Sequence, residues 1–149
     1  MKQVMFPLQF KGSAGPVEGA EGKLRAQTLA SSQVWRTALT ASGVQPLLES
    51  AGSGSATFES EVTMTGEGTF LESGSITYGT AGKVTFKTVG QGILGPSGIE
   101  GLMRGAVTWE VTGGDGAFAG ATGRFTSNFT VGAAGEVVDN HFVQLYLPG

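Results

Sequence analysis

From Ser55 onward, side chains alternate between apolar and polar with a period of two. This spacing puts neighbouring residues on opposite faces of a β-strand, and it does not match the 3.6-residue period of a helix. In residues 57–65, for example, Phe58 and Ser60 share the dry face, while Glu59 and Glu61 share the wet one. The pattern predicts extended strands with one face toward a core.

Four later segments repeat this alternation, and glycine-rich turns separate them. They span residues 69–79, 83–89, 104–112 and 124–131. The aromatic side chains of these segments all lie on the dry faces, namely Phe70, Tyr78, Phe86, Trp109, Phe125 and Phe129. We therefore expect these strands to share one core.

Three segments are less decided. Residues 3–11 read as a strand in which Pro7 indicates an edge. Residues 22–41 fit a strand or a helix, and we favour the strand because no convincing N-cap precedes them. Residues 136–147 carry apolar groups on both faces, so the register of this strand decides whether His141 or Asn140 faces the interior.

Glycine accounts for 26 of the 149 residues, which weighs against a helical bundle because glycine is a poor helix former. With 40% hydrophobic residues the chain can bury a core, and its length suits one domain spanning residues 1–149. We predict an all-β fold in which seven or eight antiparallel strands form a closed barrel. A two-sheet β-sandwich is the alternative.

Charge and cysteine content exclude several functions. The net charge is -3 and no run of basic residues is present, so we expect no nucleic-acid partner. The absence of cysteine excludes thiolate nucleophiles and Cys-ligated metals, and a single histidine excludes a multi-His metal site. We expect no cofactor and no metal. No signal peptide and no apolar stretch that could span a bilayer is apparent, so we expect a cytoplasmic protein without a membrane partner.

Residues 113–123 read Gly-Gly-Asp-Gly-Ala-Phe-Ala-Gly-Ala-Thr-Gly, which resembles the glycine-rich hairpin of the allene oxide cyclase and dirigent barrels. In such a hairpin the glycines permit tight turns, and the aromatic residue, here Phe118, closes the barrel end. The resemblance implies an eight-stranded antiparallel barrel with an apolar cavity, often in an oligomer. It carries no functional residue onto this chain, because the motif is structural.

A second glycine motif, Gly90-Gln-Gly-Ile-Leu-Gly95, matches the G-x-G-x-x-G pattern of dinucleotide sites. That site needs a helix at its third glycine, whereas Pro96 and Gly98 follow here. We therefore expect residues 90–101 to form a long flexible loop, with a lid over the barrel mouth as the functional alternative.

Three glutamates, Glu59, Glu61 and Glu110, invite a hydrolase hypothesis, since the first two would lie roughly 7 Å apart on one strand face. They share the wet faces with basic residues, however. The favoured interpretation is charge pairing on the barrel exterior.

The dry faces predict a lumen lined by aromatic rings and a few hydroxyls. The expected ligand-binding residues are Phe58, Ser60, Phe86, Trp109, Phe125, Ser127 and Phe129. His141 is the candidate catalytic residue, as a half-buried imidazole able to move a proton. A structural His bonded to backbone or water is the alternative.

The leading hypothesis is a barrel that binds a small apolar or polyene-like molecule and holds it in one conformation for cyclisation or isomerisation. A non-catalytic carrier of hydrophobic ligands, or a structural module, is the alternative from another class. For either function we expect a homo-oligomer.

Overall fold

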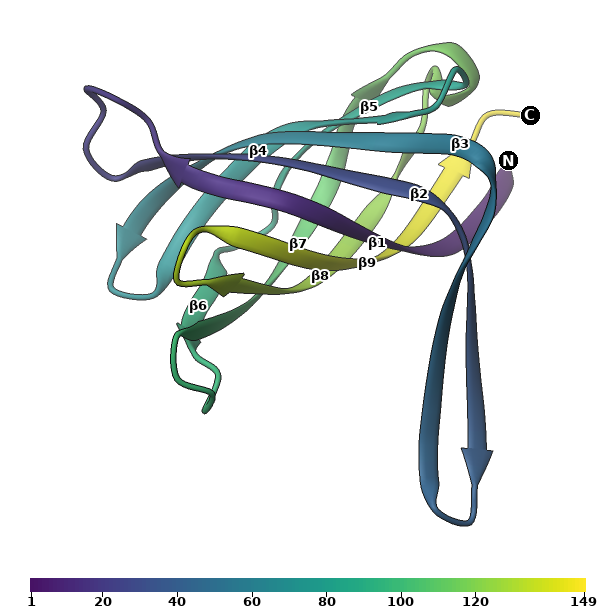
Figure 1. Cartoon of the computed structure of the whole chain (residues 1–149). Coiled ribbons are helices and arrows are strands. Elements are labelled where there is room, and N and C mark those ends of the chain that lie inside the picture. The colour runs from purple at the N-terminus through teal and green to yellow at the C-terminus, as the bar shows by residue number, and fades with distance from the viewer.

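Nine antiparallel strands form one sheet that closes into a ring in the computed structural model, which describes residues 1–149 (Figure 1). The strands are β1 (Lys2–Pro16), β2 (Lys23–Thr40), β3 (Gly43–Gly66), β4 (Thr69–Tyr78), β5 (Gly82–Thr88), β6 (Gly92–Pro96), β7 (Leu102–Gly114), β8 (Thr122–Gly132) and β9 (Glu136–Leu147). A 3-10 turn, η1 (Gly116–Phe118), joins β7 to β8. None of this helical structure is long or apolar enough to cross a membrane.

The order around the ring is β3-β2-β1-β9-β8-β7-β5-β4, and β3 pairs with β4 to close it. The short strand β6 pairs with β4 and β7, the same two neighbours as β5, so β5 and β6 share one place in the ring. The predicted all-β, antiparallel and closed arrangement is confirmed. The structure has nine strands, one more than the seven or eight predicted, and the additional strand is β6. All nine belong to one continuous sheet, so the fold is not the two-sheet sandwich considered as the alternative.

Residues 90–101 are not the long loop that their Gly and Pro content suggested, since β6 occupies their middle. Glycine is needed at Gly92 and at Gly105 of β7 because a Cβ there would overlap the rings of Phe70 and Phe129 respectively. The G-x-G-x-x-G match therefore contributes a packing glycine, and no helix follows it.

Residues 22–41 form a strand as favoured, within β2. Pro7 lies in the part of β1 that pairs with β9 but has no strand on its other side, because β2 pairs with β1 only from Lys11 to Pro16. The predicted edge position of this proline is thus confirmed.

Aromatic side chains fill the interior of the ring, which we call the lumen. Trp109 is 1% exposed, and its ring centroid lies 4.7 Å from that of Phe86 and 5.6 Å from that of Phe58. At the end of the ring beside the glycine-rich hairpin, Phe118 packs against Tyr78 at 5.2 Å. The predicted closure of this end by Phe118 is borne out in the packing.

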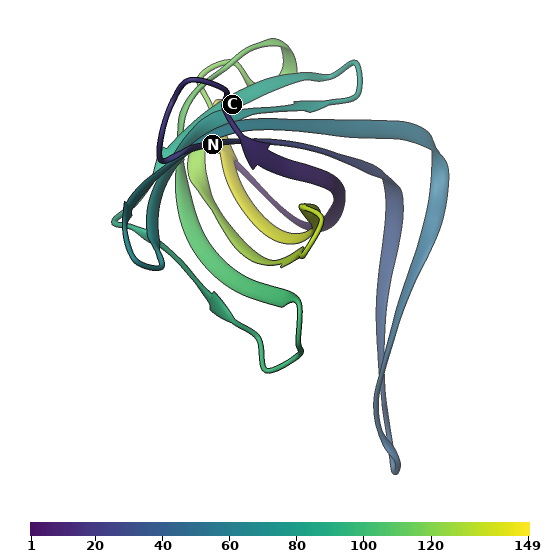
Figure 2. The ribbon, with the colours of Figure 1, turned by 60° about the vertical axis from the view of Figure 1, so that its left-hand side comes forward.

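Beyond a register shift between Ser31 and Gln33, β2 and β3 leave the ring together as a two-stranded ribbon. We call this ribbon, residues 33–50, the arm. It projects away from the ring in both ribbon views (Figure 2).

Candidate functional site

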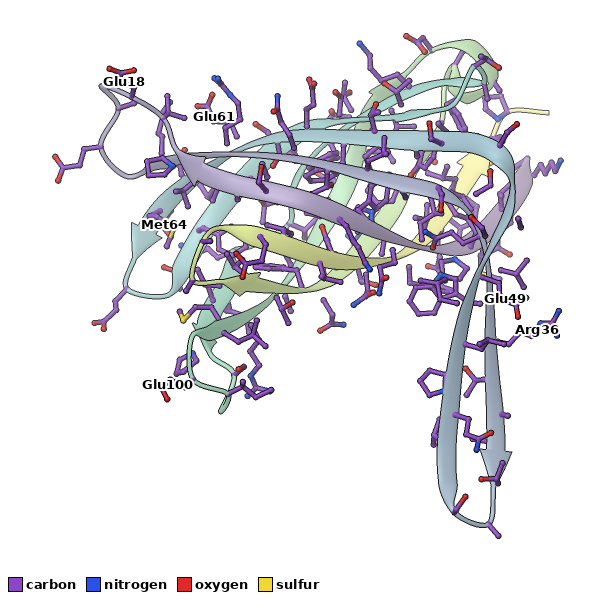
Figure 3. All side chains as sticks on the ribbon, viewed as in Figure 1. Glu18, Arg36, Glu49, Glu61, Met64 and Glu100 are labelled. Atoms are coloured by element: carbon purple, nitrogen blue, oxygen red, sulfur yellow. The ribbon has the colours of Figure 1, made fainter.

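The lumen contains a cavity of about 140 Å³. It lies toward the end of the ring where β3 turns into β4, near Met64, which Figure 3 labels. Twelve of its fifteen lining residues are hydrophobic: Ala14, Leu24, Ala26, Phe58, Val62, Met64, Phe70, Leu94, Trp109, Phe129, Val131 and Val137. The other three are polar, namely Thr28, Glu72 and Asp139.

Glu72 faces the lumen from β4, on the same strand face as Phe70 and Ile76. Its Oε1 accepts a hydrogen bond from Ser60 Oγ at 3.1 Å. The Thr88 hydroxyl accepts from the Glu72 backbone N–H and donates to the Glu72 carbonyl, at the point where the β4–β5 pairing has ended. These contacts hold the residue in place from its backbone and from its carboxyl group.

The pKa of Glu72 is raised to about 8, mainly by burial and in the second place by the negative charge of Asp139. The hydrogen bond from Ser60 and the nearby indole N–H of Trp109 both lower the pKa of Glu72, and their effects are smaller. At neutral pH the Glu72 side chain is therefore a carboxylic acid that can donate a proton.

Asp139 faces the cavity from β9 and is 5% exposed. Its Oδ1 accepts a hydrogen bond from Ser127 Oγ, and its Oδ2 lies 2.9 Å from Nε2 of His141. With its proton on Nε2, His141 donates to this carboxylate, so two donors orient Asp139.

Two buried polar atoms of the cavity wall have no hydrogen-bond partner, the Trp109 Nε1 and the Thr28 Oγ1. The indole N–H acts on the Glu72 carboxyl electrostatically without forming a hydrogen bond of normal geometry. A buried donor without a partner costs roughly 1–3 kcal/mol. A ligand with an oxygen atom would satisfy it.

The predicted ligand-binding residues fall into three groups in the structure. Phe58, Trp109 and Phe129 line the cavity. Phe86 and Phe125 pack behind Trp109, with ring centroids at 4.7 and 6.5 Å from it. The two serines, Ser60 and Ser127, donate to the two cavity carboxyls as described above. Binding by these residues stays a prediction.

The register of β9 places His141 inside the ring, 2% exposed, and Asn140 outside, where its Oδ1 accepts from Gln9 Nε2 at 2.9 Å. The imidazole does not line the cavity. It is packed behind Asp139 between aromatic rings, with the Phe10 centroid at 4.5 Å and the Trp109 centroid at 5.1 Å, and its Nδ1 has no partner. The catalytic role of His141 remains a prediction. The alternative was a structural histidine bonded to backbone or water, but its hydrogen-bond partner is the Asp139 carboxylate.

The hydrolase hypothesis is not supported by the placement of its glutamates. Glu61 pairs with Lys23 at 2.8 Å and Glu110 with Lys87 at 3.6 Å, both on the outer face of the ring. The ion pair with Lys23 lowers the pKa of the Glu61 carboxyl. Glu59 is also exposed on that face, so none of the three reaches the cavity.

The sequence analysis missed Glu72 and did not single out Asp139. A signal was present for Glu72, which lies two residues from Phe70 and therefore on the same dry face of its strand. Asp139 shares a face with His141, but the sequence did not decide which face of that strand is dry. A charged residue on a dry face is rarely buried unless it has partners or a function.

Comparisons with known proteins agree with the fold. No protein-family model matches the chain, and no curated protein matches its sequence. Its structure is similar to that of the pterocarpan synthase dirigent protein GePTS1, with a TM-score of 0.57 at 11% sequence identity. The match covers 99% of this chain and 92% of the other. At this identity the likeness establishes a dirigent-like fold, as the hairpin of residues 113–123 indicated, and nothing about the reaction.

Proposed function

We propose that the ring binds a small, mostly apolar molecule carrying one oxygen group and isomerises it by proton transfer. The observation that carries this proposal is that Glu72 and Asp139 line the same apolar cavity. Perturbed, buried ionisable groups beside a cavity are typical of functional sites.

The cavity volume favours a ligand about the size of one six-membered ring. An apolar cavity of about 150 Å³ in another protein accepts benzene, and this one has about 140 Å³. For the proposed function we therefore favour a ligand with a single ring over an extended polyene.

Glu72 and Asp139 have complementary roles in this proposal. The neutral Glu72 carboxylic acid donates a hydrogen bond to a substrate carbonyl oxygen, where negative charge develops. The Asp139 carboxylate removes a proton from the carbon next to that carbonyl, and the resulting Asp139 acid returns it two carbons further along. One C–H bond breaks, another forms, and the double bond shifts without any other reactant.

His141 and Ser127 act through Asp139 in this scheme, as positioning residues that hold the carboxylate toward the substrate. The Trp109 N–H supplies a second donor for the substrate oxygen. The name of the structural neighbour GePTS1 describes a synthase, which favours catalysis in a lumen of this fold over carriage alone.

The test uses 3-cyclohexenone, a six-membered ketone whose conversion to 2-cyclohexenone is followed by its ultraviolet absorption. We expect the wild-type protein to accelerate this shift, and Glu72→Gln and Asp139→Asn each to slow it by about 10²–10⁴-fold. Glu59→Gln, an exposed glutamate on the same type of strand, is the matched control and should leave the rate unchanged.

Phenol binding, measured by calorimetry, separates catalysis from carriage. Phenol that binds in the wild type, together with a cyclohexenone rate no faster than in buffer, would replace the proposed isomerase with the carrier alternative. Absence of both binding and turnover would remove the lumen as a ligand site.

The rate should also depend on pH through Glu72. Since the acid form is the donor, we expect activity to fall as pH rises through about 8. In Glu72→Gln this alkaline decline should be absent from the residual rate.

A further inference from the structure

The arm is amphipathic across its two faces. Cross-strand partners share a face of a ribbon, and the pairs Trp35–Leu48, Thr37–Pro46 and Leu39–Val44 put five apolar residues on one of them. We call this the apolar face of the arm. The side chains on it are exposed, from 38% for Trp35 and Leu48 to 80% for Leu39.

The opposite face carries the only charged residues of the arm, Arg36 and Glu49, each paired with an apolar residue, Leu47 and Val34 respectively. Figure 3 shows both pointing away from the ring, so the apolar face looks back toward the ring side. An isolated two-stranded ribbon is marginally stable in water and needs a third surface to cover its apolar face. The chain itself supplies none, because the arm pairs only within itself.

A second exposed apolar surface lies on the outer wall of the ring at β1 and β9. It consists of Met5, Pro7 and Phe142, where Pro7 and Phe142 are direct cross-strand partners. Met5 is 53% and Phe142 is 47% exposed. We call this the β1/β9 patch.

The root of the arm is fixed to the edge of this same wall. Gln33 Oε1 accepts from the Gln9 backbone N–H at 2.8 Å and from Trp35 Nε1 at 2.9 Å, and Gln33 Nε2 donates to the Gln9 carbonyl. The amide of Gln33 thus stands in for the strand that β1 lacks there. The arm is held out from the ring at a defined place, with its apolar face beside the β1/β9 wall.

We infer that the arm packs on a second copy of this chain, its apolar face covering the β1/β9 patch of that copy. Both surfaces are apolar, both are unpartnered, and every copy carries one of each. The arm has one cation and one anion, and the three residues of the β1/β9 patch are uncharged, so no like-charge repulsion opposes the contact between arm and patch. This assembly does not depend on what occupies the lumen.

A lipid bilayer is a less suitable partner for the arm than a second copy of the chain. Its tip, residues 40–43, consists of Thr, Ala, Ser and Gly, so no large apolar group leads into a membrane. The apolar residues lie along one face of the ribbon instead, which suits a flat protein surface.

Sedimentation velocity tests the inference on the whole chain. We expect a mass that is a multiple of 15.2 kDa. The variant Leu39→Thr/Val44→Thr/Leu48→Thr keeps residues that favour strands while removing the apolar face, and should raise the dissociation constant by about 100-fold or more. Val34→Thr/Leu47→Thr changes the other face of the same arm and should leave it unchanged.

The patch has its own matched pair. Phe142→Thr should weaken association, whereas Leu71→Thr, similarly exposed at 44% on another part of the outer wall, should not. Circular dichroism confirms that each variant keeps its strands. A wild type that sediments at 15.2 kDa at all concentrations would overturn the inference, as would a monomer that floats with phosphatidylcholine vesicles.

Engineered cysteines test which surfaces meet, because the chain has no cysteine of its own. A Thr37→Cys chain mixed with an isotope-labelled Gln144→Cys chain should form the mixed disulfide under mild oxidation. Disulfides formed only between identical chains would rule out this packing of arm on patch.

Discussion

The lumen and the arm are opposite solutions to the burial of side chains. In the lumen, Glu72, Asp139 and His141 lie at 9% exposure or less among aromatic rings. In the arm, the large apolar residues are exposed to water, and β2 and β3 pair there only with each other. Each region bears a cost that a partner would remove: an oxygen-bearing ligand in the lumen, and a protein surface on the arm.

The comparison shows that the alternation of apolar and polar side chains identifies the face of a strand that is suited to burial, but not which molecule covers that face. Two strands contribute to both regions, since β2 and β3 run from the ring into the arm with one register shift after Ser31. Only the curvature and closure of the ring separate a dry face from a wet one.

The largest expected effect is a difference in stability between the loss of an aromatic residue in the lumen and the loss of one in the arm. Phe86→Ala removes a ring that is 2% exposed and stacked on Phe58, and it should lower the free energy of unfolding by about 3–5 kcal/mol. Trp35→Ala in the arm should cost less than about 1 kcal/mol in the isolated chain, because Trp35 packs against no core. Urea denaturation at low protein concentration measures both, and equal losses would contradict the division between lumen and arm.

An intermediate effect is expected from the pH dependence of stability. The pKa of Glu72 rises from 4.5 to about 8 on folding, so its contribution is fully present below pH 4.5 and is lost as pH rises through 8. Between these values the free energy of unfolding of the wild type should fall with rising pH relative to that of Glu72→Gln. Denaturation of both proteins at pH 5, 6.5 and 8 gives this difference, and parallel curves would show that Glu72 is not buried as an acid.

The smallest effect should come from the most exposed apolar residue of the arm. Leu39→Ser should change the free energy of unfolding of single copies by no more than about 0.5 kcal/mol. Thermal unfolding at a concentration below that of self-association provides the measurement. A loss of several kcal/mol would mean that the arm packs against its own ring.

Which residues face the core could be predicted from the sequence for β3 to β5, β7 and β8, because Trp109, Phe125 and their neighbours alternate cleanly with polar groups. For β9 it could not, because both faces of that strand carry apolar residues. Closure of the sheet was also accessible, through the glycine-rich hairpin that ends at Gly123. Strand β6 was not, since Gly92, Gly95 and Pro96 disfavour a strand on local grounds and only pairing with two neighbours stabilises it.

The candidate site was predicted in part. The aromatic walls follow from the alternation, whereas the choice between His141 and Asn140 needed the strand register that only the structure gives. The two carboxyl groups of the cavity were missed because a charged residue is rarely expected on a dry face. The arm was beyond the sequence because Trp35 and Leu39 alternate as they would in a buried strand. Alternation alone does not distinguish a face that contacts the chain's own core from one left for another molecule.

The glycines at positions 92 and 105 leave the lumen with a thin wall at β6 and β7. The rings of Phe70 and Phe129 occupy the positions that side chains at residues 92 and 105 would take, and both rings also line the cavity. Replacing either phenylalanine by a smaller residue should enlarge the cavity without moving the backbone. If the cavity binds a ligand as proposed, substitution of Phe70 or Phe129 by a smaller residue should allow a larger molecule to bind.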